Sequence, residues 1–293
     1  MKGESVLIAG CGDVGSALAR MLLADGAIVH GLRRNVAALP AGVLPVPIDL
    51  RRRDDVGLLP PRVTSVVFSA AADASDEASY RSIYVEGFRN LLDGLVRAGA
   101  SPSRLVFTSS TGVYGQTDGS WVDEASPTAP RGFSGTVMLE AEALVAQWAA
   151  SRGAAAASIR LGGIYGPGRT RLVDLVRSGR ATCREGEPSW TNRIHVEDAA
   201  GAIRHLLRLS EAPDGTWVGV DDHPADSCEV YDWLADLLGV ARPRRVPGLE
   251  DSTPGDGPAP NKRCSNRRLR QSGYRFRFPS YREGYAAMLE AAG

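Results

Sequence analysis

Three glycines near the start of the chain have the spacing of a turn that binds phosphate. Gly10, Gly12 and Gly15 form a GxGxxG pattern, which follows a strand-length apolar run at residues 6–9 and precedes apolar residues at helical spacing. The first glycine would allow the sharp turn, the second would let the backbone approach a pyrophosphate, and the third would let helix and strand pack closely. We therefore predict a dinucleotide site, with a purely structural glycine turn as the alternative. Its residues would be Gly10, Gly12, Asp13, Val14 and Gly15.

Two arginines at the end of the next predicted strand bear on the kind of dinucleotide. An NAD site has Asp or Glu there, whose carboxylate binds the ribose 2′-hydroxyl. This chain instead has Arg33 and Arg34 after the predicted strand 27–32. Because a planar, permanently charged guanidinium matches phosphate oxygens, the pair indicates a 2′-phosphate and hence NADP(H), with NAD as the alternative cofactor. A solvated pair of arginines at a strand end is the structural alternative.

The composition narrows the class of protein. The 293 residues include 34 basic and 34 acidic side chains, and this formal net charge of zero indicates neither nucleic acid nor an acidic membrane surface as a partner. The four cysteines are scattered without metal-ligand spacing, so we predict no metal site and a reducing, cytoplasmic location. The sequence shows no signal-peptide pattern and no apolar run long enough to cross a bilayer, which favours the same location.

Short apolar runs alternate with amphipathic stretches through most of the chain, which predicts an α/β fold with a doubly wound parallel sheet. Beyond the first two, strands are expected at residues 43–50, 63–69, 104–110, 154–160 and 216–220. Helices are expected at 80–97, 133–151, 171–178, 196–209 and 227–238, the last with Ser227 as its N-cap. Residues 241–260 contain several Pro and Gly and are expected to form a loop.

Three motifs, taken in order, make the chain resemble a known family. They are TSSTGVYG from Thr108, RLGGIYGPG from Arg160 and RIHVEDAAGAI from Arg193. Their order and spacing are similar to those of the extended short-chain dehydrogenase/reductases, the NAD-dependent epimerase/dehydratase family. The first turn is one residue shorter than this family's usual GxxGxxG. Together with NKRCSN from Asn261 and YREGY from Tyr281, it resembles the bacterial YeeZ-like group of the superfamily.

This resemblance implies a Rossmann fold and a domain division. Residues 1–168 would form the NAD(P)-binding Rossmann domain, and 169–293 mostly a smaller C-terminal substrate lobe, with about 195–222 returning to the Rossmann sheet. Relatives often dimerise by packing two helices from each subunit, here 80–97 and 133–151, so the resemblance also implies a homodimer.

The resemblance assigns further site residues. The dinucleotide would contact Asp49 and Leu50 at its adenine and Ala70, Ala71 and Ala72 along its length. Ser110 takes the place of the upstream catalytic Ser or Thr, and Tyr165 and Arg193 are candidate substrate-binding residues. His195 and Asp198 are expected to fix the start of a helix. Thr191 stands where the family places an Arg that holds a nucleotide-sugar pyrophosphate, so the substrate class stays open.

The family's proton relay is the feature that this sequence lacks. Its reductases and epimerases carry a Tyr four residues before a Lys, and the phenol passes a proton while hydride moves to or from the nicotinamide. If Glu142 matches the family's usual Glu, Ser134 takes the Tyr position and Met138 the Lys position, and the only lysines are Lys2 and Lys262. The catalytic candidates are therefore Ser110 and Ser134. Tyr114, Tyr165 and Glu140 could also supply an acid or base, although packing or a solvated helix face explains them equally well.

Two functions of different classes remain open. The first is an NADP(H)-dependent oxidoreductase or epimerase with a non-standard acid or base, in which Ser110 orients a substrate carbonyl. The second is a non-catalytic NADP(H)-binding redox sensor or scaffold, because fold alone does not determine function. Retention of Ser110, Tyr165 and Arg193 favours an enzyme that acts on a small molecule, whereas the missing Tyr-Lys pair favours a binding protein.

Overall fold

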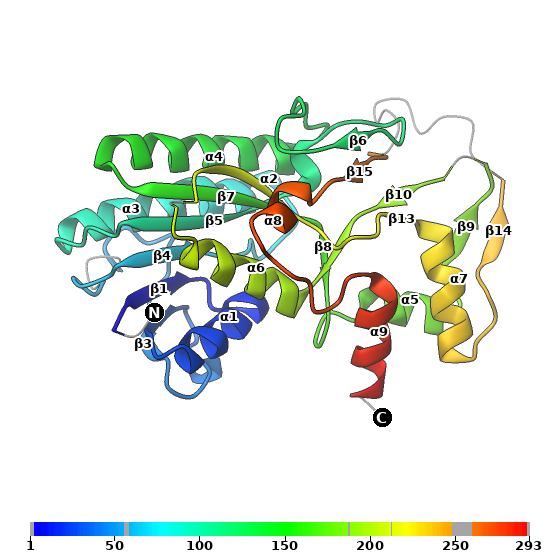
Figure 1. Cartoon of the computed structure of the whole chain (residues 1–293), viewed down its shortest axis with the longest axis horizontal. Helices are drawn as coiled ribbons and strands as arrows, with labels where there is room; N and C mark the ends of the chain where they lie inside the picture. The colour runs from blue at the N-terminus through cyan, green and yellow to red at the C-terminus, as the bar shows by residue number, and fades with distance from the viewer. Residues whose placement is uncertain (1–2, 56–58, 187, 212, 248–259, 292–293) are drawn as a thin grey trace. The chain divides into compact units, whose positions relative to one another are not determined.

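The computed structural model describes residues 3–55, 59–186, 188–211, 213–247 and 260–291 (Figure 1). The chain divides into two compact units. The first comprises residues 1–113, 130–160 and 199–217, and the second comprises 114–129, 161–198 and 218–293. Among the described residues, no helix combines the length and apolar character that a bilayer crossing needs.

The first unit carries most of a seven-stranded sheet with the order β12-β7-β5-β4-β1-β2-β3. Its strands are β1 (Ser5–Ala9), β2 (Ile28–Leu32), β3 (Leu44–Val46), β4 (Ser65–Phe68), β5 (Arg104–Ser110), β7 (Ala155–Leu161) and β12 (Gly215–Gly219). Strand β1 pairs in parallel with both β2 and β4, and the pairs β2–β3 and β4–β5 are parallel as well. Parallel neighbours need long crossover connections, which explains the alternation of strands and helices along the chain.

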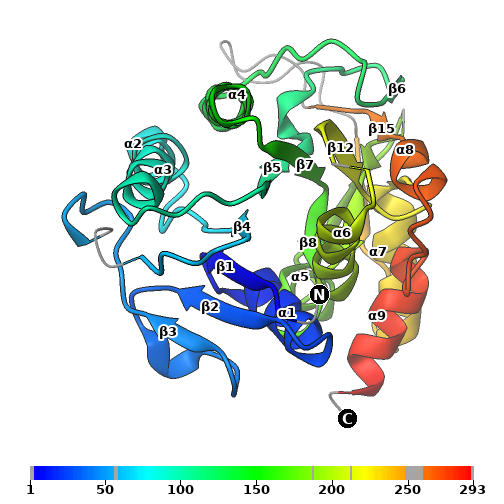
Figure 2. The ribbon, with the colours of Figure 1, turned by 60° about the vertical axis from the view of Figure 1, so that its left-hand side comes forward.

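Helices cover both faces of this sheet. Helices α1 (Asp13–Ala24) and α6 (Val196–Arg208) lie on one face, and α2 (Glu77–Arg81), α3 (Phe88–Arg97) and α4 (Phe133–Arg152) lie on the other (Figure 1, Figure 2). Arg204 of α6 donates from Nε to Asp25 at the end of α1 over 2.6 Å, which ties the two helices together. The arrangement confirms the predicted doubly wound α/β fold.

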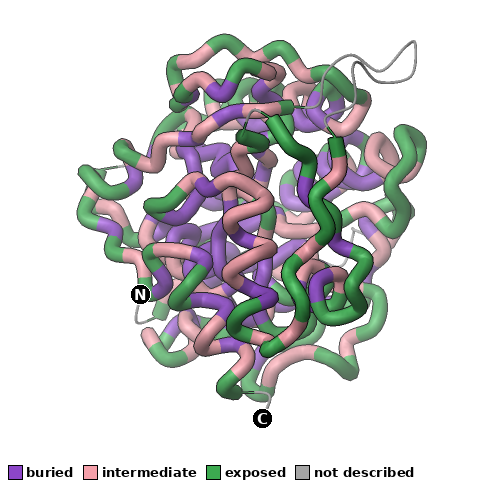
Figure 3. The backbone as a smooth tube through the Cα atoms, turned by 90° about the vertical axis from the view of Figure 1, so that its right-hand side faces the viewer, coloured by how far each residue is buried: buried purple, intermediate pink, exposed green. Residues whose placement is uncertain are grey.

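Aromatic side chains join the sheet to the α3 side of this unit. Phe68 in β4 packs against Phe88 in α3 with ring centroids 5.0 Å apart, and against Phe107 in β5 at 5.5 Å. All three rings are fully buried and all five residues of β1 are buried, and Figure 3 draws such buried positions in purple. The strand and helix that flank the glycine turn are thus fixed to a closely packed core.

Several predicted boundaries differ from the structure. Strand β3 ends at Val46 rather than at residue 50, because Ile48 N donates back to the Val46 carbonyl oxygen at 2.9 Å and turns the chain there. The helix predicted over 80–97 begins at Glu77, because the Asp76 side chain accepts from Ser79 N at 2.8 Å and caps it. Between α2 and α3 the residues Ser82–Gly87 form a π-helical segment, so the predicted helix is not regular throughout.

The second unit consists of short strand pairs and helices. The pairs are β15 (Arg263–Cys264) with β6 (Trp121–Val122), β11 (Arg193–His195) with β8 (Gly163–Tyr165), β10 (Trp190–Thr191) with β13 (Ala225–Asp226), and β14 (Arg244–Val246) with β9 (Thr182–Arg184). The helices are α5 (Arg171–Arg177), α7 (Ser227–Leu238), α8 (Arg267–Gln271) and α9 (Tyr281–Glu290). The prediction of a loop over 241–260 is wrong at β14, whose backbone pairs with a strand far away in sequence. Residues 248–259 of that prediction lie outside the described residues.

The Asp198 side chain holds a C-terminal segment of the second unit in place. Asp198 accepts from Arg277 N at 2.8 Å, Phe278 N at 2.9 Å and the Tyr274 hydroxyl at 2.9 Å. Asp198 therefore satisfies donors of a C-terminal segment, whereas the sequence predicted that it would satisfy donors at its own helix start. The N-cap of α7 is Asp226 rather than Ser227, and the Asp226 side chain accepts from Ser189 N at 2.8 Å instead of capping the helix.

Candidate functional site

The glycine turn between β1 and α1 is shaped by two close approaches. Gly10 has φ of +92°, and a Cβ atom there would lie 2.2 Å from the Ala70 Cα and backbone N, so only glycine lets the end of β1 lie against the chain after β4. A Cβ atom on Gly15 would lie 2.6 Å from the Gly10 carbonyl oxygen. The Ser69 hydroxyl donates to that same oxygen over 2.9 Å. These contacts fix the turn without any ligand.

The open side of the turn lies at Gly12 and Asp13. A Cβ atom on Gly12 would meet no atom within 4 Å, and both residues are exposed, whereas Val14 is buried. Gly12 is the N-cap of α1 and has no side chain that could cap this helix. A helix start beside an unobstructed glycine fits a pyrophosphate. Ala70, which follows β4, lies half-buried against Gly10, and the next two residues are the exposed Ala71 and the half-buried Ala72.

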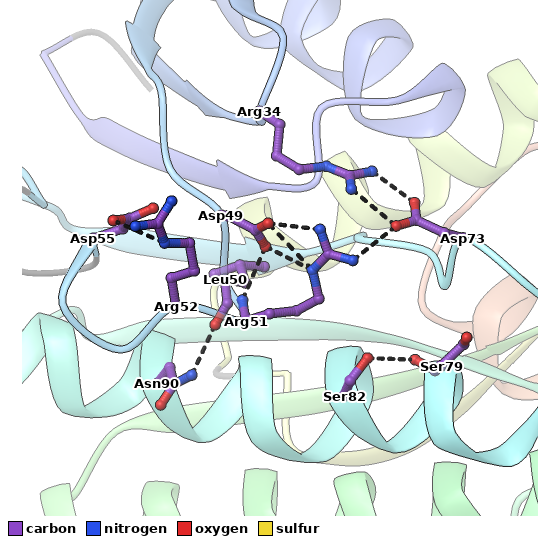
Figure 4. Close-up of polar contacts among 10 residues, drawn as sticks. All are labelled: Arg34, Asp49, Leu50, Arg51, Arg52, Asp55, Asp73, Ser79, Ser82 and Asn90. Atoms are coloured by element: carbon purple, nitrogen blue, oxygen red, sulfur yellow. Dashed lines mark hydrogen bonds and ion pairs between the residues drawn. The ribbon is translucent and has the colours of Figure 1, made fainter.

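Two guanidiniums lie beyond the end of β2, as the sequence predicts. Arg33 is half-buried and donates from Nη1 to the Cys11 carbonyl oxygen over 3.0 Å, which places it at the glycine turn. Arg34 is exposed and makes two hydrogen bonds to Asp73, at 2.9 and 2.6 Å (Figure 4). Asp49 lies after β3, and the Leu50 carbonyl oxygen accepts from the Asn90 side chain at 2.8 Å. The predicted cofactor residues of β1, β2, β3 and β4 thus all follow the carboxyl ends of neighbouring strands.

The two serine candidates lie at the end of β5 and the start of α4. Ser110 is half-buried, and its Oγ accepts from Gly112 N at 3.0 Å. A Cβ atom on Gly135 would lie 2.6 Å from the Gly112 carbonyl oxygen, so the first turn of α4 touches the turn that follows Ser110. The half-buried Ser134 belongs to that same first turn, and Met138 one turn later is buried.

The remaining predicted residues, Tyr165 and Arg193, lie in the core of the second unit. Tyr165 is 3% exposed, stacks on Tyr285 with ring centroids 4.3 Å apart, and donates to the Ser280 carbonyl oxygen over 3.3 Å. Burial raises the pKa of Tyr165 above its ordinary value. Arg193 is also buried and hydrogen-bonds the Tyr285 phenol, and its Nη1 finds no hydrogen-bond partner in the part of the chain that the structure describes.

Comparison with known proteins identifies the family of this chain. The model of the NAD dependent epimerase/dehydratase family matches residues 6–218. The chain belongs to this family. The match includes the glycine turn, the arginines after β2, Ser110 and Arg193, so it extends over predicted site residues in both units.

Individual relatives of this chain agree with the family match. Protein YeeZ of Escherichia coli K12 is 34% identical over 166 residues, and the alignment spans 55% of each chain, about half the length of that curated relative. A Methylobacillus flagellatus structure provisionally assigned as an NAD-dependent epimerase/dehydratase is 38% identical, with a TM-score of 0.80 over 99% of this chain and 98% of that chain. The UDP-glucose 4-epimerase of Thermus thermophilus, solved in complex with NAD, is 25% identical with a TM-score of 0.77 over 98% of both chains.

Sequence reasoning missed two charged residues, Arg51 and Asp73, that lie among the predicted cofactor residues. Arg51 donates to both oxygens of Asp49, at 2.9 Å from Nε and 2.6 Å from Nη2, and also reaches Asp73 over 3.1 Å (Figure 4). The hydrogen bond from Arg34 lowers the pKa of Asp73, and that from Arg51 lowers the pKa of Asp49. The local sequence gave one signal, since Arg51 directly follows the predicted adenine residues Asp49 and Leu50.

The other side chains that could act as acid or base have structural partners. The Glu140 carboxylate pairs with Arg81 at 2.8 Å and with Arg89 at 3.5 Å. The Tyr114 hydroxyl donates to the Asp123 carbonyl oxygen over 2.7 Å, and this ring is fully buried. His195 is buried, and its Nδ1 accepts from Glu197 N at 3.2 Å. Over the described ranges, no group of three or more His, Cys, Asp and Glu side chains is placed to hold a metal ion.

Proposed function

We propose that this epimerase/dehydratase binds NADP(H) at the glycine turn and uses it in an oxidoreductase or epimerase reaction on a small molecule. The observation that carries the proposal is the open backbone at Gly12, beside two arginines that follow β2. The site lies at the carboxyl ends of parallel strands, where proteins of this architecture bind their ligands. The relative from Thermus thermophilus, which binds NAD, supports a nicotinamide dinucleotide as the ligand.

The proposed preference for NADP(H) follows from charge at the end of β2. The three residues after this strand are Arg33, Arg34 and Asn35, so no carboxylate follows the strand directly to accept from a ribose 2′-hydroxyl. The Cys11 carbonyl oxygen holds Arg33 at the turn. A guanidinium there would donate to two phosphate oxygens and remain charged at any working pH.

The remaining cofactor contacts follow from the same strand ends. The pyrophosphate would lie on the N–H groups of the turn, and the adenine beside Asp49 and Leu50. We assign the contacts to Gly10, Gly12, Asp13, Val14, Gly15, Arg33, Arg34, Asp49, Leu50, Ala70, Ala71 and Ala72.

Catalysis would then rest on the substrate-orienting residues of the chain. The bound nicotinamide supplies or accepts hydride. Because the Ser110 oxygen accepts from Gly112 N, its own hydrogen is free to be donated to a substrate carbonyl oxygen. Ser134 at the start of α4 is the second hydroxyl proposed for this role. We propose substrate contacts for Arg193 and Tyr165, and no acid role for Tyr165, because burial holds its proton on the phenol.

A non-catalytic NADP(H) sensor or scaffold is the second candidate function, and one observation favours it. Met138, at the position assigned to the family's Lys, is only 5% exposed and packs into the core. A side chain in that place supplies neither a charge to activate a hydroxyl nor a donor to hold the ribose. The two functions differ in whether NADPH is consumed with any substrate.

Substitution of Ser110 tests the catalytic part. In a screen of aldehydes, ketones and nucleotide sugars with NADPH, we expect turnover that falls about a hundredfold in Ser110→Ala, because the carbonyl oxygen loses its donor. The Kd for NADP+ should stay unchanged, and Ser151→Ala at the exposed end of α4 serves as the matched control. Equal turnover in Ser110→Ala and the parent chain would contradict the assignment, and no turnover with any substrate would favour the sensor.

A double substitution tests the cofactor preference. We expect Arg33→Ala combined with Arg34→Ala to weaken NADP+ binding at least tenfold in calorimetry, because both donors to the 2′-phosphate are lost. NAD+ binding should change little, since its ribose carries no phosphate. Equal weakening of both nucleotides would contradict the preference and indicate a general role of the arginines in folding the turn.

Two broader features belong to the same proposal. We propose a homodimer that forms through α3 and α4, because the outward residues Ala143, Ala146 and Ala150 of α4 are small and exposed, which permits close approach of a second helix. We also propose a cytoplasmic location, since Cys11, Cys183, Cys228 and Cys264 are all free thiols.

A further inference from the structure

The Asp73 carboxylate lies between two guanidiniums that come from different strand ends. Arg34 follows β2 and binds both of its oxygens, at 2.9 and 2.6 Å. Arg51, which lies beyond β3, binds the Asp73 Oδ2 atom from the other side at 3.1 Å. Figure 4 shows the two guanidiniums pointing toward this single carboxylate. One anionic group therefore receives hydrogen bonds from two arginines at the predicted adenosine end of the site.

A second carboxylate holds Arg51 independently of Asp73. Asp49 accepts from the Nε and Nη2 atoms of Arg51, at 2.9 and 2.6 Å, and it is the least exposed member of the cluster at 17%. The Nη1 atom of Arg51 is the one that reaches Asp73. Loss of the Asp73 contact would consequently leave Arg51 in place, with Nη1 still directed at the position of the Asp73 carboxylate.

Asp73 itself is the partner that can be displaced most easily. It is 48% exposed and Arg34 is 54% exposed, so water can replace their mutual hydrogen bonds at little cost. Asp73 also follows Ala70 to Ala72, small residues without long side chains to anchor the segment. A phosphate monoester carries more charge than a carboxylate and three acceptor oxygens, so it competes well for the same two guanidiniums.

We propose that the Asp73 carboxylate occupies the place of the cofactor 2′-phosphate in the free protein, and that Arg51 is a further phosphate-binding residue in addition to Arg33 and Arg34. The inference rests on the proposed NADP(H) function and explains how the site would discriminate NADP(H) from NAD(H). The 2′-phosphate displaces Asp73 and takes over its hydrogen bonds from Arg34 and Arg51, while Asp49 keeps Arg51 aligned. NAD(H) brings no anion, so Asp73 stays paired when it binds.

Calorimetric titration of three variants with four nucleotides tests this inference. The nucleotides are NADP+, NAD+, adenosine 2′,5′-bisphosphate and 5′-AMP, of which the last two isolate the effect of the 2′-phosphate. Asp73→Asn keeps the shape of the side chain but removes its charge, and we expect it to bind both 2′-phosphate ligands about tenfold more tightly, with NAD+ and 5′-AMP unchanged. Arg51→Ala should weaken the binding of NADP+ about tenfold relative to NAD+, and that of adenosine 2′,5′-bisphosphate about tenfold relative to 5′-AMP.

Arg52→Ala is the matched control, because Arg52 is 74% exposed and pairs only loosely with Asp55, at 3.7 Å. It should leave all four affinities unchanged. Unchanged selectivity in both Asp73→Asn and Arg51→Ala would overturn the inference while nucleotide binding stands. Weaker NAD+ binding in Asp73→Asn would also overturn it, because Asp73 would then be an acceptor for the ribose hydroxyl. If the parent chain binds none of the nucleotides, the proposed function fails together with this inference.

Discussion

Asp221 is a buried carboxyl group with an incomplete set of hydrogen bonds. It is 2% exposed, its Oδ1 accepts from His223 N at 3.1 Å, and its Oδ2 has no hydrogen-bond partner among the described residues. Burial raises the pKa of Asp221 to about 8, although the charge of Arg193 opposes the shift. A protonated carboxyl in this place avoids the cost of a buried, incompletely bonded anion.

This pKa shift predicts a pH dependence of stability. At a pH between the unfolded pKa of ~4 and the folded pKa of about 8, the folded chain keeps a proton on Asp221 that the unfolded chain releases. The stabilisation is therefore complete below the unfolded pKa. It is lost as the pH rises from there through the folded pKa, by up to ~1.4 kcal/mol per pH unit. We expect Asp221→Asn, measured by urea unfolding at several pH values, to gain stability over the parent chain steadily from pH 5 to 8. A difference that does not change with pH would contradict this account.

The residues of the candidate site differ in how far the sequence could predict them. Gly10, Gly12 and Gly15 act within one turn, so their spacing alone predicts the geometry that the structure shows. The contact of Arg51 with Asp73 joins residues 22 positions apart that follow β3 and β4, two strands separated in the sheet by β1 and β2, and no local pattern indicates it. Folding brings the two together only because β3 and β4 share one sheet.

At the scale of elements, a buried ion pair fixes α4 to the sheet. Glu142 of α4 accepts from Arg160 of β7 at 3.0 Å from Nε and 2.7 Å from Nη2, and from the Ser109 hydroxyl of β5 at 2.6 Å. The Arg160 and Glu142 side chains are only 7% and 10% exposed. The pair therefore aligns the helix that carries Ser134 with the strand that ends at Ser110.

Removal of this ion pair should cost much more than removal of a surface pair on the same helix. We expect Glu142→Ala to lower the free energy of unfolding by ~3 kcal/mol or more, because it leaves the buried Arg160 cation uncompensated. Glu140→Ala is the matched control and should cost at most ~1 kcal/mol, since its pairs with Arg81 and Arg89 are solvent-exposed. Urea unfolding measures both, and equal losses would contradict the structural role of Glu142.

The elements themselves could be predicted well wherever apolar periodicity was regular. The strand at residues 104–110 and the helix at 227–238 match β5 and α7 throughout. Periodicity does not indicate β14, because its three residues are mostly exposed and form a strand only by pairing with β9. Helix α9 has a local signal, the capping box of Ser280 and Glu283, which our apolar pattern did not use.

At the scale of the whole molecule, each unit has its own buried core. The first is the sheet with its two helical layers, and the second gathers Tyr165, Tyr281, Tyr285 and the apolar faces of α5 and α7. The predicted cofactor residues all belong to the first unit, and the proposed substrate residues Tyr165 and Arg193 belong to the second. Ser110 and Ser134, the hydroxyls proposed to orient the substrate, belong to the first unit with the cofactor residues, so the proposed substrate contacts come from both units.

The proposed homodimer gives a prediction at this scale. We expect light scattering to give about twice the mass of one chain, and Ala146→Arg to shift the mass toward a single chain, because a long charged side chain prevents close approach of the α4 helices. Ser178→Arg, an exposed position beyond α5, should leave the mass unchanged. A single-chain mass for the parent protein would contradict the dimer.

The central claim is that the chain holds a nicotinamide dinucleotide with a 2′-phosphate. Calorimetric titration of the unmodified chain with NADP+, NADPH, NAD+ and NADH under one condition tests it most directly. We predict comparable affinities for NADP+ and NADPH, each at least tenfold tighter than for the corresponding NAD form, a difference of ~1.4 kcal/mol. Tighter binding of the NAD forms would contradict the preference, and no binding of any of the four would contradict the cofactor site itself.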